Sequence, residues 1–137
     1  MSEFHLDLVA AQSDVDDLNH VSNVAYVRWV QEVARAHSEA GGWGMAEYQK
    51  LGAVWVVRRH DIEYLAPAFA GDAIRLETWV ESWQAASATR RTRISRVAGG
   101  AAAELARATT TWVLVSTDGG RPRRIPPEMR AAFENPR

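Results

Sequence analysis

Cysteine is absent from the 137-residue sequence, which excludes a disulfide framework, a thiolate metal site and a cysteine nucleophile. The sequence also lacks any run of about 18 apolar residues, the length that a membrane-spanning helix requires. Neither sign of charge is in excess, because 16 basic and 17 acidic side chains leave a net charge of −1. This balance gives no reason to expect nucleic acid or an acidic membrane as a partner. The N-terminus lacks the basic start and apolar core of a signal peptide, so we expect a soluble, cytoplasmic protein.

The composition that remains is that of a folded protein. Hydrophobic residues make up 47% of the chain and six residues are tryptophan, which favours a packed core over disorder. The length suits one ordinary domain, and the sequence contains no internal repeat, low-complexity tract or linker. We therefore predict a single domain over residues 1–137.

Hydrophobic periodicity predicts one long helix followed by a series of strands. Residues 23–40 place apolar side chains on one helical stripe, with Ser22 or Asn23 as the N-terminal cap and Gly41-Gly42 as the end. Elsewhere alternating and β-branched residues predict strands, which turn residues separate. The predicted strands cover residues 3–11, 53–65, 73–83, 87–97 and 103–116, and short helices are predicted at 43–51 and 128–134.

This order of elements predicts an α+β fold. A single long helix covers only one face of a sheet, and short turns between the last four strands argue for antiparallel pairing. The uncovered face and the open edge of such a sheet must be satisfied in another way, and a second copy of the chain would do this. We therefore expect a homodimer or a dimer of dimers.

The stretch SDVDDLNHVSNVAY concentrates ionisable and amide side chains just before the long helix. These side chains are Asp14, Asp16, Asp17, Asn19, His20 and Asn23. A calcium loop would need an oxygen ligand where Leu18 stands and an acid where Ala25 stands, and a transition-metal site would need a second histidine at ligand spacing. We therefore predict no metal site. Because Asp, Asn and Ser also cap helices and form turns, a purely structural loop remains one interpretation.

A catalytic interpretation follows from the position of the carboxylates. The first turn of a helix has free backbone N–H groups and the positive end of the helix dipole, which can receive the negative charge that develops on a carbonyl oxygen. A carboxylate beside such a site can activate water as a general base, or attack the carbonyl itself. These groups suffice to open an ester or a thioester, and His20 and Asn23 could hold the carbonyl, orient water or move a proton.

The extended segment SDVDDLNHVSNVAYVRWVQEV resembles the active-site signature of hotdog-fold acyl thioesterases of the 4-hydroxybenzoyl-CoA thioesterase-like group, and is similar to the equivalent segment of plant acyl-ACP thioesterases. The stretches IEYLAPAFAGDAIRLETWV and DGGRPRRIPPEMRAAF are also similar to that family, so the resemblance covers nearly the whole chain. It implies a hotdog fold, an antiparallel sheet wrapped around one long helix. It also implies hydrolysis of an acyl-CoA thioester, with acyl carrier protein as the alternative carrier and with no metal or organic cofactor.

Position by position, the resemblance implies roles for five side chains. Asp16 matches the catalytic carboxylate of the family, which acts as nucleophile in some members and as general base in others. Asp14 matches the first aspartate of the motif, which usually supports the loop. His20 and Asn23 match the assisting His and Asn, and Tyr26 matches the motif Tyr, which we expect to bind substrate.

The sequence departs from the family pattern at three positions. Asn19 stands where many members have Gly, and Ser22 stands where many have Asn. Leu18 replaces an active-site Asn of the plant enzymes, and their catalytic Cys has no counterpart in a chain without cysteine. The single-carboxylate chemistry of the bacterial CoA thioesterases is therefore the closer match.

Arginines cluster on the strand at 87–97 and after the strand at 103–116. They are Arg90, Arg91, Arg93, Arg96, Arg121, Arg123 and Arg124. Planar guanidinium groups bind phosphate well, and the resembling family meets the phosphates of coenzyme A with basic residues on the outer sheet face and near the C-terminus. We therefore predict that Arg90, Arg91 and Arg123 bind substrate through these phosphates. The alternative is a solvated face of salt bridges with neighbouring Glu residues.

Several other side chains have less specific interpretations. His37 lies on the apolar stripe of the helix, so we expect it in the core or in an interface. Glu63 is either a second acid at the site or, as the simpler interpretation, an exposed strand acid. Trp79, Trp83 and Trp112 either line an acyl pocket or simply pack.

Two other functions remain open. A hotdog hydratase or dehydratase would use a His with an acid to add water to an enoyl thioester, although the spacing from Asp16 to His20 is not usual for those enzymes. A non-catalytic module would bind an acyl thioester without hydrolysing it.

Overall fold

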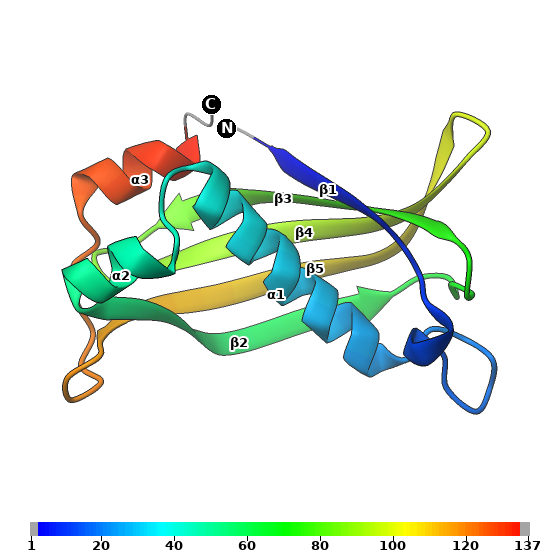
Figure 1. The fold of residues 1–137 in the computed structure, drawn as a ribbon, viewed down its shortest axis with the longest axis horizontal. Helices are drawn as coiled ribbons and strands as arrows, with labels where there is room; N and C mark the ends of the chain where they lie inside the picture. The colour runs from blue at the N-terminus through cyan, green and yellow to red at the C-terminus, as the bar shows by residue number, and fades with distance from the viewer. Residues whose placement is uncertain (1–2, 135–137) are drawn as a thin grey trace.

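The structure is a computed structural model that describes residues 3–134. Over that range it contains one sheet of five strands together with three α-helices (Figure 1). The elements in chain order are β1 (Phe4–Val9), the 3₁₀ turn η1 (Gln12–Asp14), α1 (Asn23–Ala40), α2 (Met45–Leu51), β2 (Ala53–Tyr64), β3 (Ala73–Trp83), β4 (Ser87–Ala98), β5 (Ala101–Ser116) and α3 (Pro127–Glu134). The predicted order of elements is confirmed, and α1 and β3 have the predicted bounds.

The five strands pair antiparallel in the order β1-β3-β4-β5-β2, and α1 crosses one face of this sheet (Figure 1). Successive side chains of a strand point to opposite faces. On β3, Leu76 and Thr78 are therefore buried beneath the helix, while Glu77 and Trp79 are partly exposed on the other face. The predicted α+β architecture, an antiparallel sheet around one long helix, is confirmed.

α1 is held to the sheet by its apolar stripe. Ser22 caps the helix, since its Oγ accepts a hydrogen bond from the Ala25 N–H at 3.4 Å. Trp29, Val30 and Val33 then face the sheet with at most 2% of their surface exposed. Burying each of these side chains stabilises the fold by about 1.5–3 kcal/mol, so the stripe determines how the helix lies on the sheet.

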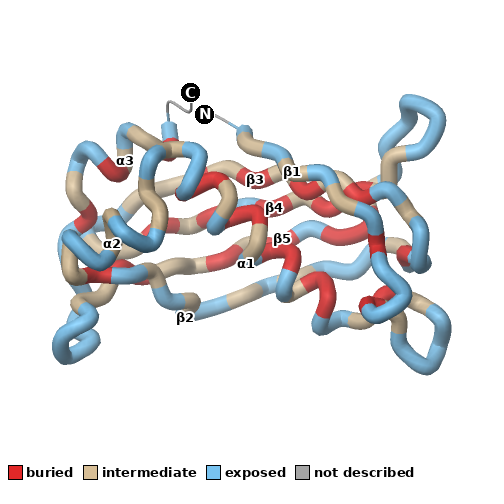
Figure 2. Tube along the Cα trace, in the orientation of Figure 1, coloured by how far each residue is buried: buried red, intermediate tan, exposed pale blue. Residues whose placement is uncertain are grey.

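The core has two parts along the length of α1, and Figure 2 shows buried segments continuing from one to the other. One part lies under the N-terminal half of α1. The other lies at the α2 end, where α3 closes it with Met129 and Phe133. α3 can approach α1 closely because α1 ends at Gly41, where a Cβ atom would lie 3.1 Å from the carbonyl oxygen of Ala132.

A buried polar cluster joins α1 to the sheet between these two parts. His37 of α1 is fully buried, and Phe4 stacks on its ring. Nη1 of Arg90 on β4 lies 2.9 Å from Nδ1 of His37 and donates to Oγ1 of Thr78 at 3.1 Å. Because a guanidinium only donates, Nδ1 of His37 must be the unprotonated acceptor. The prediction that His37 belongs to the core is confirmed.

The two edges of the sheet differ. β1 is a short edge strand, whereas β2 runs for 12 residues with no strand of residues 3–134 on its outer side. Val54 and Val56 of β2 are 37% and 41% exposed. Within residues 3–134, a long edge with exposed apolar side chains is thus left open, which is the usual feature of a strand that pairs with another chain.

Protonation of His37 should make stability depend on pH. Burial, together with the positive charge of Arg90, lowers the pKa of His37 from 6.5 to about 4. The unfolded chain therefore takes up a proton near its ordinary pKa while the folded chain does not, so the free energy of unfolding falls as pH drops through this window. In the wild type, the free energy of unfolding should fall by about 2 kcal/mol between roughly pH 7 and pH 5 because of His37. We expect this contribution to be absent from His37→Gln. Urea unfolding at several pH values measures this, and parallel curves for the two proteins would contradict it.

Candidate active site

The loop between η1 and α1 is a small closed hairpin. Val15 and Val21 pair as an isolated antiparallel bridge. Inside it, the Asp16 N–H donates to the His20 carbonyl at 2.8 Å, and the Asn19 N–H donates to the Asp16 carbonyl at 3.0 Å. These bonds define the backbone of the segment that the sequence singles out as catalytic.

The carboxylate of Asp16 is oriented by its own loop. Its Oδ1 accepts from the Leu18 N–H at 2.9 Å and from the His20 N–H at 3.3 Å. In the described part of the chain no hydrogen bond reaches its other oxygen, Oδ2. Asp16 is exposed, so the loop presents one oriented carboxylate oxygen to the outside.

Asp14 lies only two residues away in a contrasting environment. Its side chain is buried; Oδ2 accepts from the Ala11 N–H at 2.9 Å, and Oδ1 pairs with the guanidinium of Arg28 on α1. Its backbone carbonyl accepts from the Ser22 N–H at 2.8 Å. Burial alone would raise the pKa of Asp14, but the bonds from Ala11 and Arg28 outweigh it and the pKa is lowered. Asp14 thus ties the loop to the start of α1, the supporting position that the sequence predicts.

The start of α1 follows directly after this loop. The first N–H groups of a helix have no acceptor within the helix, and the side chains of Asn23 and Val24 are both exposed there. Val21 N–H donates to the Ala68 carbonyl at 2.8 Å, so the bend at 66–71 holds the helix start in place. The structure therefore brings Asp16, His20 and Asn23 into one short, accessible region.

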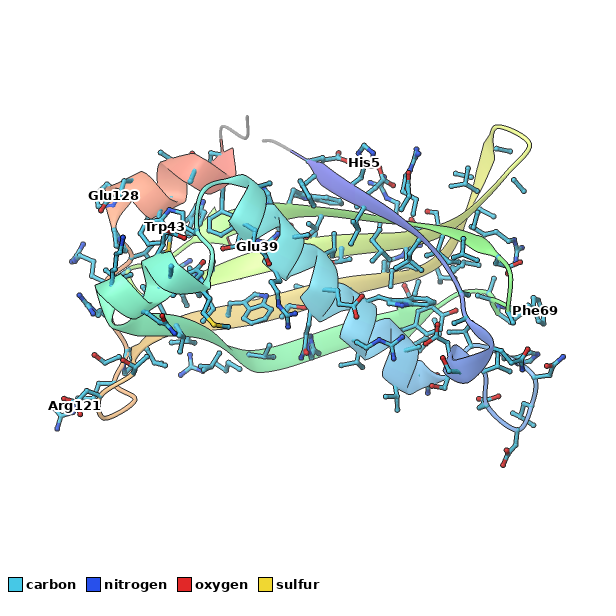
Figure 3. The ribbon with its side chains drawn as sticks, in the orientation of Figure 1. His5, Glu39, Trp43, Phe69, Arg121 and Glu128 are labelled. Atoms are coloured by element: carbon cyan, nitrogen blue, oxygen red, sulfur yellow. The ribbon has the colours of Figure 1, made fainter. Side chains whose placement is uncertain are left out.

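His20 is half-buried against the same bend. Its ring meets the ring of Phe69 edge-on, with 5.4 Å between the centroids. Phe69 itself is 40% exposed, and Figure 3 shows it at the loop end of the molecule. The bend thus contributes an apolar surface beside the oriented carboxylate, a feature that sequence reasoning did not assign to the site.

Tyr26, which the sequence predicts to bind substrate, is buried in the core. Its side chain is 3% exposed, and its ring packs edge-on against the rings of Trp29 and Tyr64, at centroid distances of 5.4 and 5.3 Å. Burial raises the pKa of Tyr26. Tyr26 thus lies in the core beneath the helix start, where its contact with Tyr64 anchors that start to the end of β2.

The three arginines expected to bind phosphate do not converge. Arg91 lies on the outer sheet face and pairs with Glu81 at 3.0 Å. Arg90, one residue earlier, points to the helix side and is 4% exposed. Arg123 is exposed at the α2 end, where its guanidinium donates to the carbonyl of Leu51. The expectation that Arg90 shares an outer, phosphate-binding face with Arg91 is therefore corrected, because neighbouring strand residues face opposite ways.

A second concave feature lies at the α2 end of α1. It is a cavity of about 840 Å³ between α1, α2 and the sheet. Aromatic rings form much of its wall: Trp43, Tyr48, Trp55, Trp83, Trp112 and Phe133. Trp83 and Trp112 thus line a pocket, whereas Trp79 lies on the other face beneath Arg93.

Sequence reasoning missed the other rings of this wall because they come from separate elements. The alternation within β2 was the one available signal, since it places Trp55 on the same face as the buried Ala53. Trp43 and Tyr48 reach the cavity only through the position of α2.

The cavity and the Asp16 loop lie at opposite ends of α1. About 15 residues of helix separate Asn23 from Ser38, which lines the cavity, and at 1.5 Å per residue this is about 22 Å. Figure 3 shows Trp43 and Phe69 far apart along the molecule. Within one chain, the oriented carboxylate therefore does not open onto the cavity.

Residues 3–134 contain no cluster of three His, Asp or Glu side chains that could hold a metal ion. In the same range, no helix is long and apolar enough to cross a membrane.

The backbone at Asn19 offers a direct test of the loop. Its φ is 63°, in the left-handed region, which Gly and Asn tolerate and β-branched residues do not. We expect Asn19→Gly to leave the free energy of unfolding nearly unchanged and Asn19→Val to lower it by about 1–2 kcal/mol. Leu18→Val is the matched control, since Leu18 is exposed in the same loop and its φ is not positive. Equal effects at both positions in urea unfolding would exclude backbone strain as the cause.

Comparison with known proteins places these features in a family. Residues 10–133 match the model of the thioesterase-like superfamily. Over 111 residues, 76% of this chain, the sequence is 32% identical to oleoyl-acyl carrier protein thioesterase 2, chloroplastic, of Arabidopsis thaliana. The chain spans 29% of the length of that relative.

Solved structures share the whole fold. A 1,4-dihydroxy-2-naphthoyl-CoA thioesterase from Synechocystis superposes with a TM-score of 0.87 at 18% identity, covering 98% of this chain and 97% of that one. A 4-hydroxybenzoyl-CoA thioesterase mutant in complex with 4-hydroxybenzoyl-CoA superposes with a TM-score of 0.87 at 21% identity, covering 96% and 98%. A DHNA-CoA thioesterase from Staphylococcus aureus superposes with a TM-score of 0.87 at 17% identity, and the match covers 98% of this chain and 90% of that one. The chain has the hotdog fold and belongs to the thioesterase-like superfamily.

Proposed function

We propose that this protein hydrolyses an acyl-CoA thioester to the free acid and coenzyme A. The observation that carries the proposal is the carboxylate of Asp16, which two N–H groups orient directly before the exposed start of α1. Membership of the thioesterase-like superfamily supports the reaction class. A 4-hydroxybenzoyl-CoA complex among the proteins of this fold supports coenzyme A as the carrier.

The chemistry follows from where charge develops. As water or a carboxylate oxygen attacks the thioester carbonyl, negative charge gathers on the carbonyl oxygen, and the free N–H groups at the start of α1 can receive it. Asp16 either takes a proton from the attacking water or forms a transient anhydride that water then opens. The carbon–sulfur bond breaks, and the thiolate of coenzyme A leaves and takes up a proton. His20 and Asn23 stand near enough in the chain to orient the water or the carbonyl.

The acyl pocket is supplied by a second copy of the chain in this proposal. Antiparallel pairing of two β2 edges across a two-fold axis would set the Tyr64 end of one strand beside the Ala53 end of the other. At one end of β2, the ring of Tyr64 packs on that of Tyr26 at the start of α1, with 5.3 Å between the centroids. At the other end of β2, residues 54–57 line the cavity. The Asp16 loop of one protomer would then face the cavity of its partner.

The same arrangement leaves a role for Arg123. It lies at the α2 end with Arg121, which Figure 3 labels on the turn after β5. In a β2-paired dimer this end is next to the partner's Asp16 loop, so Arg123 remains our candidate for contact with the phosphates of coenzyme A. Arg91 is a weaker candidate, because its ion pair with Glu81 already uses its charge.

Replacing the carboxylate of Asp16 tests the reaction. We expect Asp16→Asn to lower kcat for acyl-CoA hydrolysis about a hundredfold or more, with little change in KM, because the amide keeps the shape but cannot act as base or nucleophile. Asp17→Asn, an equal charge change at the next exposed position, should retain activity. Release of thiol from a panel of short, long and aromatic acyl-CoAs measures both. Full turnover by the Asp16 variant would exclude the mechanism, and binding without thiol release by the wild type would identify a binding module.

A charge on the open edge tests the dimer. We expect Val56→Lys to convert the protein from dimer to monomer and to abolish hydrolysis, since a lysine on an edge strand opposes strand pairing. Val9→Lys is the matched control, because Val9 is 65% exposed on β1, at the opposite edge of the sheet. Light scattering after size exclusion gives the mass of each variant. An active monomer would contradict the shared site.

A further inference from the structure

The cavity contains one deeply buried charge. Arg90 lines it and is 4% exposed. Its hydrogen bonds go to Thr78 and His37, both from Nη1, and its guanidinium lies over the ring of Phe133, 5.3 Å from the centroid. Each of these partners is neutral, so the contacts position the guanidinium without balancing its charge.

The described part of the chain offers Arg90 no counter-charge. Among residues 3–134, arginines other than Arg90 make all the ion pairs, and no carboxylate lies within ion-pair distance of Arg90. Glu39 lines the same cavity but is exposed on α1, with no bond to Arg90. His37 stays neutral, since its Nδ1 accepts from Arg90 and burial with the nearby guanidinium lowers its pKa to about 4.

A buried guanidinium without an anionic partner is unfavourable, so Arg90 calls for an anion from outside the described chain. A buried charge without a partner costs far more than a buried apolar group, and other arginines of this strand, Arg91 and Arg93, are paired with carboxylates. The described hydrogen bonds of Arg90 use Nη1, which leaves Nε and Nη2 of the guanidinium fork without an acceptor. Two N–H donors in a planar fork match the two oxygens of a carboxylate.

The walls of the cavity add to this preference. The indole N–H groups of Trp83 and Trp112, whose rings line the cavity, are buried and have no acceptor within residues 3–134. Its aromatic rings favour a flat or apolar body. A ligand that suits these walls has an apolar middle and an anionic end.

We propose that this cavity selects acyl groups that carry a carboxylate at the end remote from the thioester, and that Arg90 binds this carboxylate. The substrate class is then the monothioester of a dicarboxylic acid, with an aromatic body preferred. This inference rests on the proposed hydrolase function. Arg90 acts here as a specificity-determining residue, because it contacts the far end of the acyl group and takes no part in breaking the thioester.

The test uses two substrates that differ in one group. They are 4-carboxybenzoyl-CoA and 4-methylbenzoyl-CoA, and kcat/KM is measured for both with the wild-type protein and with Arg90→Met. We expect the wild type to prefer the carboxylated substrate by about tenfold to a hundredfold, as a charge-assisted hydrogen bond is lost with the methyl group. The variant should lose this preference, chiefly through a higher KM for the carboxylated substrate. An equal loss on both substrates would show that Arg90 has a structural role only.

Two further variants keep the test decisive. Thr78→Val removes a neutral partner of the same guanidinium, and it should retain the preference for the carboxylated substrate. If Arg90→Met fails to fold, Arg90→Lys retains the charge without the planar fork, and we expect it to keep only part of the preference. A wild type with no preference between the two substrates would overturn the inference.

Failure of the inference and failure of the hydrolase function give different results. Asp16→Asn should abolish hydrolysis of both substrates, whereas Arg90→Met should remove the difference in kcat/KM between them. If the wild type hydrolyses neither, calorimetry of 4-carboxybenzoyl-CoA and 4-methylbenzoyl-CoA binding still decides the inference. Tighter binding of the carboxylated compound, lost in Arg90→Met, would support it without hydrolysis. Equal affinities would refute it.

Discussion

The burial of one stripe of α1 against the sheet is the interaction on which the rest of the structure depends. Trp29, Val30 and Val33 have almost no exposed surface, so the helix has one position on the sheet. That position decides where the helix begins, and therefore where its free N–H groups point. It also decides where the helix leaves the sheet near Gly41, and hence the shape of the cavity beneath α2 and α3.

Two aspartates in one short loop show how environment separates a buried, supporting carboxylate from an exposed, oriented one. Asp14 is buried, and its two carboxylate oxygens are bonded to Ala11 and Arg28. These bonds favour its charged form and occupy both oxygens. Asp16 is exposed, and its two N–H bonds both fall on one oxygen. The first carboxylate makes the loop rigid, and the rigidity gives the second a defined direction. Neither role follows from the residue type.

The arginines of β4 show the same division across the sheet. On the outer face, Arg91 and Arg93 take part in ion pairs with glutamates, and partly exposed pairs of this kind add little stability. On the inner face, Arg90 has only neutral partners in a low-dielectric setting, where a matching anion would interact strongly. Because side chains alternate between the two faces along β4, the same strand carries a solvated salt-bridge surface on one face and a buried cation on the other.

Much of this protein was determined by the sequence itself. Local rules act within a few residues, so the bounds of α1, the cap at Ser22, the alternation of β3 and the antiparallel α+β arrangement could all be predicted. The signature around Asp16 also indicated the candidate catalytic loop, because its residues are contiguous. The presence of Asn19 where many family members have Gly also follows from a local property, since Asn adopts the left-handed backbone that this turn requires.

Only the tertiary structure decided which face of each element is used. Alternation shows that Arg90 and Arg91 point in opposite directions, but not which of them meets the helix. The motif places Tyr26 near the loop, but its burial depends on Tyr64, far along the chain. The cavity is assembled from α1, α2, α3 and four strands. No local rule links residues so distant in sequence, because the free energy that brings them together comes from packing of the whole core.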